Sequence, residues 1–153
     1  MHADILLRTP GGDPIAVIEA KGAMNLTPEL AVDIRRRMLA HGLPAHVPYF
    51  LLLTQERGYL WQDSALLRSD TPPTIEFPMT EVVTRYLPAA PGARLHGVQL
   101  ELLLVQWLTE LVAQMPRSQG EPERTLGKTG FLEAIRDAQV LHEAPLGPAG
   151  ALA

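Results

Sequence analysis

Three ionisable residues, Asp4, Glu19 and Lys21, stand at the ends of two short aliphatic runs near the start of the chain. Two neighbouring carboxylates repel each other unless a cation lies between them or one of them is protonated. Carboxylate oxygens with no His or Cys nearby favour a hard ion such as Mg²⁺ or Mn²⁺. A lysine beside such an ion can orient or help to deprotonate an attacking water, or offset negative charge that builds up on a phosphate. These residue types therefore favour phosphodiester chemistry.

The two aliphatic runs predict the β-hairpin that would position these side chains. Residues 3–9 and 15–21 are rich in Ile, Leu and Val, and the turn sequence PGGDP separates them. We take Gly11-Gly12 as a two-residue loop, with Pro10 opposite Asp13. This loop sets the pairing register of the two strands.

In this register, directly opposed side chains share one face of the sheet. Because side chains alternate along a strand, Lys21 projects on the same side as Glu19. The three ionisable side chains are then expected to converge at one end of one face. The predicted pairs are Arg8 with Ile15, Leu6 with Val17, and Asp4 with Glu19.

A helix and a second strand pair are expected after the hairpin. Thr27 suits the N-cap of a helix over residues 28–41, and Gly42 suits its C-terminal end. An unbroken apolar strand at 49–54 is expected to be covered on both faces, and a second strand follows at 58–62. For this region we predict a buried helix stripe of Leu30, Ile34 and Met38, a solvent-facing side with Arg35, Arg36 and Arg37, and packing rather than base stacking for Tyr59 and Trp61.

The rest of the chain reads as mainly helical, with a short helix at 81–87, a long one at 97–114 and a last one at 130–143. The expected organisation is a core over 1–62, a helical elaboration of the same domain over 63–114, and a linker, short helix and flexible tail over 115–153. The apolar stripe of the 97–114 helix is wide enough for a core face and a partner face, so that a homodimer is expected to form there. The predicted fold class is mixed α/β, a central mixed sheet flanked by helices with a C-terminal helical extension.

The motif and its element order resemble the PD-(D/E)XK nuclease superfamily, which has the restriction-endonuclease-like fold. The signature reads "AD" at 3–4 and "EAK" at 19–21, followed by a helix and an apolar strand. The resemblance covers residues 3–62. It implies that Asp4 and Glu19 hold Mg²⁺ or Mn²⁺ with the Ala20 carbonyl, that Lys21 assists the water, and that DNA is the substrate, with RNA not excluded.

The chain departs from the family pattern in two ways. Ala3 stands where the family has proline, and the family core has a helix and a strand before the first acid, whereas Asp4 lies three residues from the start. Either segments upstream are missing, a later helix fills that position, or the site is incomplete. A carboxylate that the first family helix often supplies has no match in the motif.

Composition narrows the classes of function further. The 153 residues include no cysteine, which excludes disulfides and thiolate metal sites and fits a cytoplasmic protein. The five histidines show no metal-binding spacing. Acidic and amide residues interrupt the longest apolar region, so no membrane partner is expected. The net charge of −4 gives no global basic field, and nucleic acid would need a local patch.

Two other readings stay open beside the nuclease. The first is a catalytically silent scaffold or protein-interaction module on the same fold, which would form a stable oligomer or partner complex. The second is an unrelated α/β domain that binds a small molecule or a protein. It would gain support if Asp4 and Glu19 lay on opposite faces of the sheet.

Overall fold

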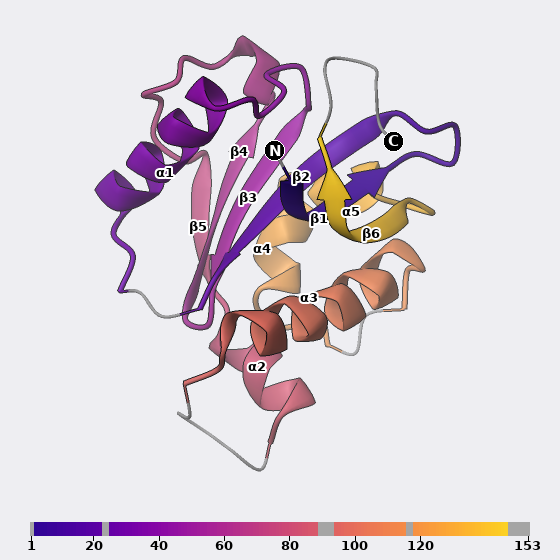
Figure 1. Cartoon of the computed structure of the whole chain (residues 1–153). Helices are drawn as coiled ribbons and strands as arrows, with labels where there is room; N and C mark the ends of the chain where they lie inside the picture. Colours follow the sequence, from indigo (N-terminus) through magenta and orange to yellow (C-terminus); the bar gives the residue numbers. More distant parts are fainter. Residues whose placement is uncertain (1, 23–24, 89–93, 116–117, 147–153) are drawn as a thin grey trace.

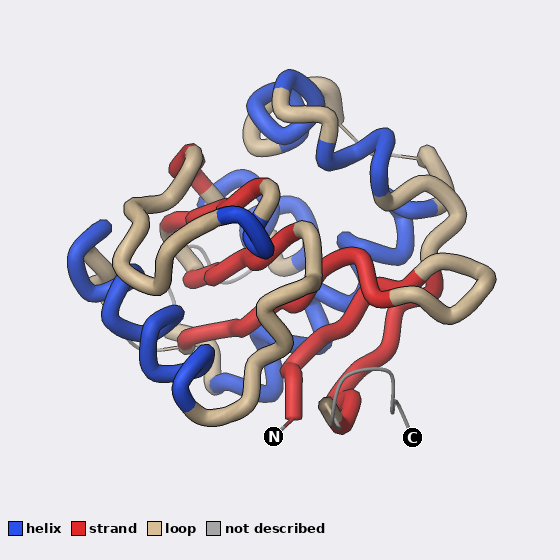
Figure 2. Tube along the Cα trace, turned by 90° about the horizontal axis from the view of Figure 1, so that it is seen from above, coloured by secondary structure: helices blue, strands red, loops and turns tan. Residues whose placement is uncertain are grey.

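The computed structural model describes residues 2–22, 25–88, 94–115 and 118–146. Helices and strands alternate irregularly along the chain, and helices lie on both sides of a strongly twisted sheet (Figures 1 and 2). The strands are β1 (His2–Arg8), β2 (Pro14–Lys21), β3 (Tyr49–Thr54), β4 (Arg57–Gln62), β5 (Ile75–Pro78) and β6 (Gln139–Pro145). The helices are α1 (Pro28–Ala40), the 3₁₀ turn η1 (Ser64–Leu66), α2 (Thr80–Tyr86), α3 (Gly97–Val112), α4 (Glu123–Lys128) and α5 (Phe131–Ala134).

The six strands form one mixed sheet in the order β5-β4-β3-β2-β1-β6. Strands β2 and β3 run parallel, joined by the α1 crossover, and the other neighbours are antiparallel. Strands β1 and β6 come from opposite ends of the chain and lie side by side (Figure 1). The predicted mixed α/β class is therefore confirmed, and so is the interior position of β3.

Each face of the sheet has its own hydrophobic core. One core, which includes Ile18 and Leu51, packs under α2, α3, α4 and α5. The other, which includes Val17 and Leu52, packs under α1. Strands covered on both faces read as continuous apolar runs, which is why the sequence of β3 has no polar alternation. Among the described residues, no helix combines the length and the apolar character needed to cross a membrane.

The predicted ends of α1 are confirmed. The Thr27 side chain accepts a hydrogen bond from the Leu30 amide at 3.2 Å, which satisfies one of the unpaired donors at the helix start. At the other end Gly42 has φ +111°, and the Leu43 amide donates to the Met38 carbonyl at 2.9 Å. Glycine adopts this left-handed conformation without a steric cost, so the helix stops here.

Two predicted side-chain positions on α1 are wrong. Leu30 is 39% exposed rather than buried, and Arg35 is buried rather than solvated. The Arg35 guanidinium donates to the Ser64 hydroxyl at 2.9 Å and the Arg68 carbonyl at 2.9 Å, and it lies over the ring of Trp61. Arginine can be buried when its donors find acceptors and an aromatic face. The periodicity of the helix sequence does not predict the loop containing Ser64 and Arg68 that covers Arg35.

The predicted two-residue hairpin loop is also wrong. The strands end at Arg8 and begin again at Pro14, and the Thr9 amide donates to the Asp13 carbonyl at 2.8 Å, which closes a longer loop. An irregularity between Leu7 and Arg8 pairs Arg8 with Pro14 instead of the predicted Ile15. The bulge absorbs the difference in loop length. The predicted pairing of Leu6 with Val17 is therefore preserved.

The C-terminal region departs most from the prediction. Of the predicted 130–143 helix, only Phe131–Ala134 is α-helical, and Gln139–Pro145 forms β6 instead. Asp137 adopts φ +59°, which ends the helical turn, and the open edge of β1 supplies backbone partners for the next residues. Strand β5 was not predicted either, because Pro72, Pro73 and Pro78 obscure its short apolar pattern. The predicted flexible tail beyond residue 146 lies outside the described residues.

A buried ion pair connects α3 to α2 and α4, which cover the same core. Glu123 accepts hydrogen bonds from both terminal nitrogens of Arg85, at 2.6 and 3.3 Å, and from the Trp107 indole at 3.0 Å. The three residues join α2, α3 and α4. A buried carboxylate destabilises the fold when any of its hydrogen-bond donors is lost. This contact therefore holds α3 in place against α2 and α4.

Candidate functional site

Asp4 lies where the hydrogen-bond ladders on both sides of β1 are interrupted. The ladder with β2 stops at Ile5, and the ladder with β6 skips from Ala3 to Ile5. On β6, Glu143 has φ +55°, which bends the strand opposite Asp4. As a result Ala3 joins the core under α1 although Ile5 belongs to the other core. Such irregularities re-aim side chains, and the two interrupted ladders leave an opening in the hydrogen bonding of the sheet at Asp4.

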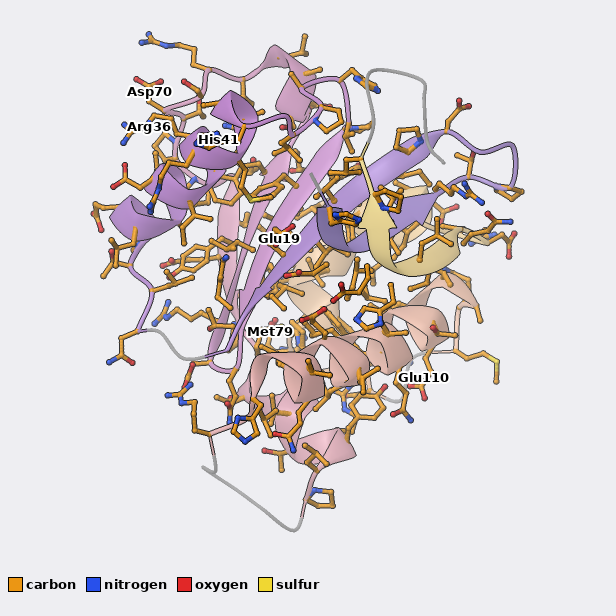
Figure 3. The ribbon with its side chains drawn as sticks, viewed as in Figure 1. Glu19, Arg36, His41, Asp70, Met79 and Glu110 are labelled. Carbon is orange, nitrogen blue, oxygen red and sulfur yellow. The ribbon has the colours of Figure 1, made fainter. Side chains whose placement is uncertain are left out.

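Asp4 and Glu19 come together in this opening, as the sequence predicted, although not as a regular ladder pair. The Ala20 amide donates to Asp4 Oδ2 at 2.8 Å, and the Asp4 amide donates to Glu19 Oε1 at 3.3 Å. Each side chain thus substitutes for a backbone acceptor of the interrupted ladder. Glu19 lies near the middle of the molecule, on the part of the sheet between α1 and α3 (Figure 3). One oxygen of each carboxylate is held in place by the main chain.

The surroundings of Glu19 favour its neutral form. Glu19 is only 6% exposed. Burial raises its pKa from 4.5 to about 8, and hydrogen bonding and charge repulsion from Asp4 add to the rise, whereas the Asp4 amide and the Lys21 charge oppose it. At neutral pH Glu19 therefore carries a proton, and a bound cation would offset the same repulsion between the two side chains.

The donor set fits a hard divalent ion. Asp4 and Glu19 offer carboxylate oxygens, and Ala20 adds a carbonyl, all of which are ligands that Mg²⁺ and Mn²⁺ accept. The Ala20 amide points toward Asp4. The amide and carbonyl of one strand residue face the same neighbouring strand, so the Ala20 carbonyl faces the same opening. An ion bound here would replace the proton on the buried Glu19 and offset the repulsion between the two carboxylates.

Lys21 lies on the α1 face of the sheet with Glu19, as predicted. It pairs in register with Thr54 at the end of the parallel β2–β3 ladder, and it lines a hollow with three residues of α1. Its positive charge lowers the pKa of Glu19, which agrees with a position close to the carboxylate. The arrangement keeps one cationic group beside the two acids. Asp4 and Glu19 are therefore in contact through the main chain, and Lys21 lies near enough to Glu19 to affect its pKa.

A second polar group adjoins this cluster from the other side. His142 Nε2 lies 3.0 Å from Glu101 Oε1 and 3.8 Å from Glu143 Oε1, and one ligand atom from each residue falls within 4.8 Å of the others. Burial raises the pKa of Glu101; the hydrogen bond with His142 opposes the rise, and the charges of Glu143 and Asp4 add to it. Glu101 is therefore close enough to Asp4 to feel its charge.

The sequence pattern did not predict this second group, because the five histidines show no metal-binding spacing. One signal was present: Glu101 falls on the same helical stripe as Leu104 and Leu108, where a charged side chain is unusual. No signal marked His142, because its position depends on the pairing of β6 with β1. Tyr59 and Trp61 are buried as predicted, so they offer no surface for base stacking.

The chain matches no family model, and no curated protein or solved structure matches it at a significant level.

Proposed function

We propose that this protein is a divalent-metal-dependent nuclease that hydrolyses phosphodiester bonds in DNA, with RNA as a further substrate class. The observation that carries the proposal is the interlocked pair of Asp4 and Glu19 in an opening of the sheet, with Ala20 between the acids and Lys21 on the same face. A buried carboxylate such as Glu19, whose pKa is raised beside a second acid, is typical of functional sites. Cytoplasmic nucleic acid is the proposed substrate pool.

The resemblance to the PD-(D/E)XK pattern gains support from the elements around β1. That pattern has a helix and a strand before its first acid. Here β6 pairs with β1 on the side away from β2, and α3 packs against β1, β2 and β6. Both elements come later in the chain. Helix α3 also brings the buried Glu101 toward Asp4, in the role of the carboxylate that the pattern expects from a helix.

The chain's own residues would divide the hydrolysis between them. Asp4, Glu19 and the Ala20 carbonyl would hold Mg²⁺ or Mn²⁺, which when bound supplies Lewis-acid activation of the phosphodiester. Lys21 would orient the attacking water and offset the charge that develops on the phosphoryl oxygens. The water oxygen forms a bond to phosphorus, one P–O ester bond breaks, and the proton released from water is balanced by the one taken up by the leaving alkoxide.

The test is cleavage of single-stranded, duplex and forked DNA and of single-stranded RNA, with Mg²⁺, with Mn²⁺ and with EDTA. Lys21→Ala should lower the rate by about 100-fold or more, since a lost charge-stabilising or proton-transferring group typically costs this much. The matched control is Lys128→Ala, because Lys128 is the one other lysine of the sequence and is exposed. Equal cleavage by both variants, or cleavage in EDTA, would assign the activity to another site or to a contaminant.

A second candidate function is a homodimeric interaction module, and the outer face of α3 favours it. Val98 is 61% exposed and Leu102 is 55% exposed. Leu102 also lines a hollow of about 260 Å³ with Tyr86, the last residue of α2, and Leu87, which follows it. The exposed side chains of α3 are Val98, Gln99, Leu102, Gln106 and Thr109, none of which is charged. A second copy can meet such a face across a two-fold axis without like-charge repulsion.

Sedimentation velocity tests this candidate directly. Leu102→Glu would place two like charges across the axis and should convert a dimer to a monomer, whereas Gln106→Glu at the edge of the same hollow should weaken the dimer less. A wild-type protein that remains monomeric at high concentration would contradict the dimer. Two results together would favour the interaction module over the nuclease: the wild-type protein is a dimer, and the Lys21→Ala variant functions as the wild type does.

A further inference from the structure

A hollow of about 400 Å³ lies on the α1 face of the sheet, beside the acidic pair. It is lined by Lys21 at the end of β2 and by Ile34, Arg37 and Met38 of α1. Lys21 belongs to the candidate site, so the hollow opens from that site toward α1. Of the described residues that line it, two are basic and none is acidic.

Arg37 differs from its neighbour Arg36 in what it contacts. Arg36 forms an ion pair with Asp33, and it lies on the outer side of α1, away from the sheet (Figure 3). Among the described residues, no acidic side chain forms an ion pair with Arg37, whose Nε donates to the Asp33 carbonyl at a long 3.4 Å. Arg37 is exposed. Its charge therefore faces the hollow without a fixed counter-charge.

The floor of the hollow is apolar. Ile34 and Met38 are half-buried and lie one helical turn apart, so their side chains form one continuous surface. A phosphate ion alone would not contact such a floor. A sugar-phosphate chain would, because its sugars present carbon-rich faces between anionic phosphates. The combination of two separate cations and an apolar surface matches this repeating chemistry.

We propose that this hollow, the Lys21–Arg37 groove, binds the sugar-phosphate backbone of the nucleic-acid strand, with Arg37 holding a phosphate that neighbours the one at Lys21. This inference rests on the proposed function and adds the path of the strand: it runs from the acidic pair along the inner side of α1. Arg37 is then a substrate-binding residue that acts before any chemistry, and the guanidinium suits phosphate because it offers several donors in one plane.

Binding without cleavage tests the groove. Fluorescence anisotropy of a labelled single-stranded DNA oligonucleotide, and of RNA of the same sequence, is measured in EDTA over a range of NaCl concentrations. Arg37→Ala should weaken binding by roughly three- to tenfold and reduce the slope of log K against log[salt] by about 0.7, as expected for one lost phosphate contact on a single strand. Arg37→Lys should recover the slope. Arg36→Ala removes the same charge from the same helix and should leave both quantities unchanged within about twofold.

The outcomes separate this inference from the nuclease proposal. Equal effects of Arg36→Ala and Arg37→Ala would mean that only net charge matters, and would overturn the groove even if the protein cleaves DNA. Binding that depends on Arg37 without any metal-dependent cleavage would support the groove and contradict the nuclease. Absence of binding by the folded wild-type protein to either nucleic acid would overturn the groove. Competition with inorganic polyphosphate tests the role of the apolar floor. An unlabelled nucleic acid of equal charge should displace the labelled oligonucleotide better than polyphosphate does, because only the nucleic acid has sugars to contact the floor.

Discussion

Asp4 and Glu19 each bind the main chain of the other's strand: the Asp4 carboxylate accepts from the Ala20 amide at 2.8 Å, and Glu19 accepts from the Asp4 amide at 3.3 Å. The two acids thereby close the gap where the β1–β2 ladder stops. This places them within reach of one another before any ligand binds. The cost of burying Glu19, together with its closeness to Asp4, raises the pKa of Glu19, and this pKa can be measured by titration.

The first prediction concerns stability against pH without metal. The pKa of Glu19 is about 8 in the folded protein and 4.5 as its ordinary value, so the native state binds the extra proton between these limits. Stability contributed by the neutral acid is therefore present below about pH 4.5 and is lost as pH rises toward 8. Glu19→Gln keeps a neutral side chain. Its free energy of unfolding relative to wild type should increase by on the order of 3 kcal/mol between about pH 4 and about pH 9.

Urea denaturation in EDTA at both pH values measures this difference. Glu133→Gln is the control, because Glu133 is an exposed acid paired with Arg136 and should show little pH-dependent difference from wild type. An identical pH dependence for Glu19→Gln and wild type would show that Glu19 titrates normally.

The second prediction links metal binding to proton release. Glu19 must lose its proton to bind a cation, so apparent Mn²⁺ affinity should rise about tenfold per pH unit below pH 8 and level off above it. Calorimetry at about pH 7 in two buffers of different ionisation enthalpy should detect release of nearly one proton per ion. Glu19→Gln should abolish that release. If Glu19→Gln binds metal and releases as many protons as the wild type, the ion binds elsewhere, for instance at Glu101, His142 and Glu143.

The third prediction concerns Gly58 in β4, where side chains of the neighbouring strands pack directly against the glycine Cα. A Cβ added at Gly58 would lie 2.1 Å from Phe77 Cε2 and 2.8 Å from Leu53 Cδ2. Gly58→Ala must displace the Phe77 ring and should destabilise the protein by about 1–3 kcal/mol, as overpacked cores do. At Gly97 an added Cβ meets no atom within 4 Å, so Gly97→Ala should be neutral or slightly stabilising. Thermal unfolding of the two variants compares them, and similar midpoints would contradict this packing.

The fourth prediction concerns the contact that positions α3. Glu123→Gln keeps the shape but removes the charge that balances Arg85, whose side chain is only 15% exposed. Leaving a buried charge without its partner should cost about 2–4 kcal/mol of unfolding free energy. Glu133→Gln breaks an exposed pair and should cost less than about 0.5 kcal/mol. A small effect at Glu123 would mean that water reaches this pair.

Prediction from sequence succeeded where the signal was local and continuous along the chain. The hairpin, the ends of α1 and the apolar β3 follow from turn residues, caps and hydrophobic runs, each of which acts within a few residues. The loop at Gly11-Gly12 was wrong, yet Leu6 still faces Val17, because the buried pattern of both strands sets the register more strongly than the loop does.

Long-range partners explain the errors. Arg35 is buried because the loop containing Ser64 and Arg68 folds over α1, and Gln139–Pro145 becomes a strand because β1 has an open edge. Neither partner can be read from neighbouring residues. Tertiary context overrides local preference in both segments.

The sequence by itself determined the mixed α/β class, the hairpin and the proximity of Asp4 to Glu19 at the open end of that hairpin, because strand alternation and apolar patterning act locally. Only the tertiary structure decided that the chain's two ends join at β1 and β6, that Glu101 and His142 flank Asp4, and that the sheet opens there. These contacts connect residues more than a hundred positions apart along β1 and β6. Their formation depends on which edges and faces remain uncovered after the local elements have formed, which no single segment encodes.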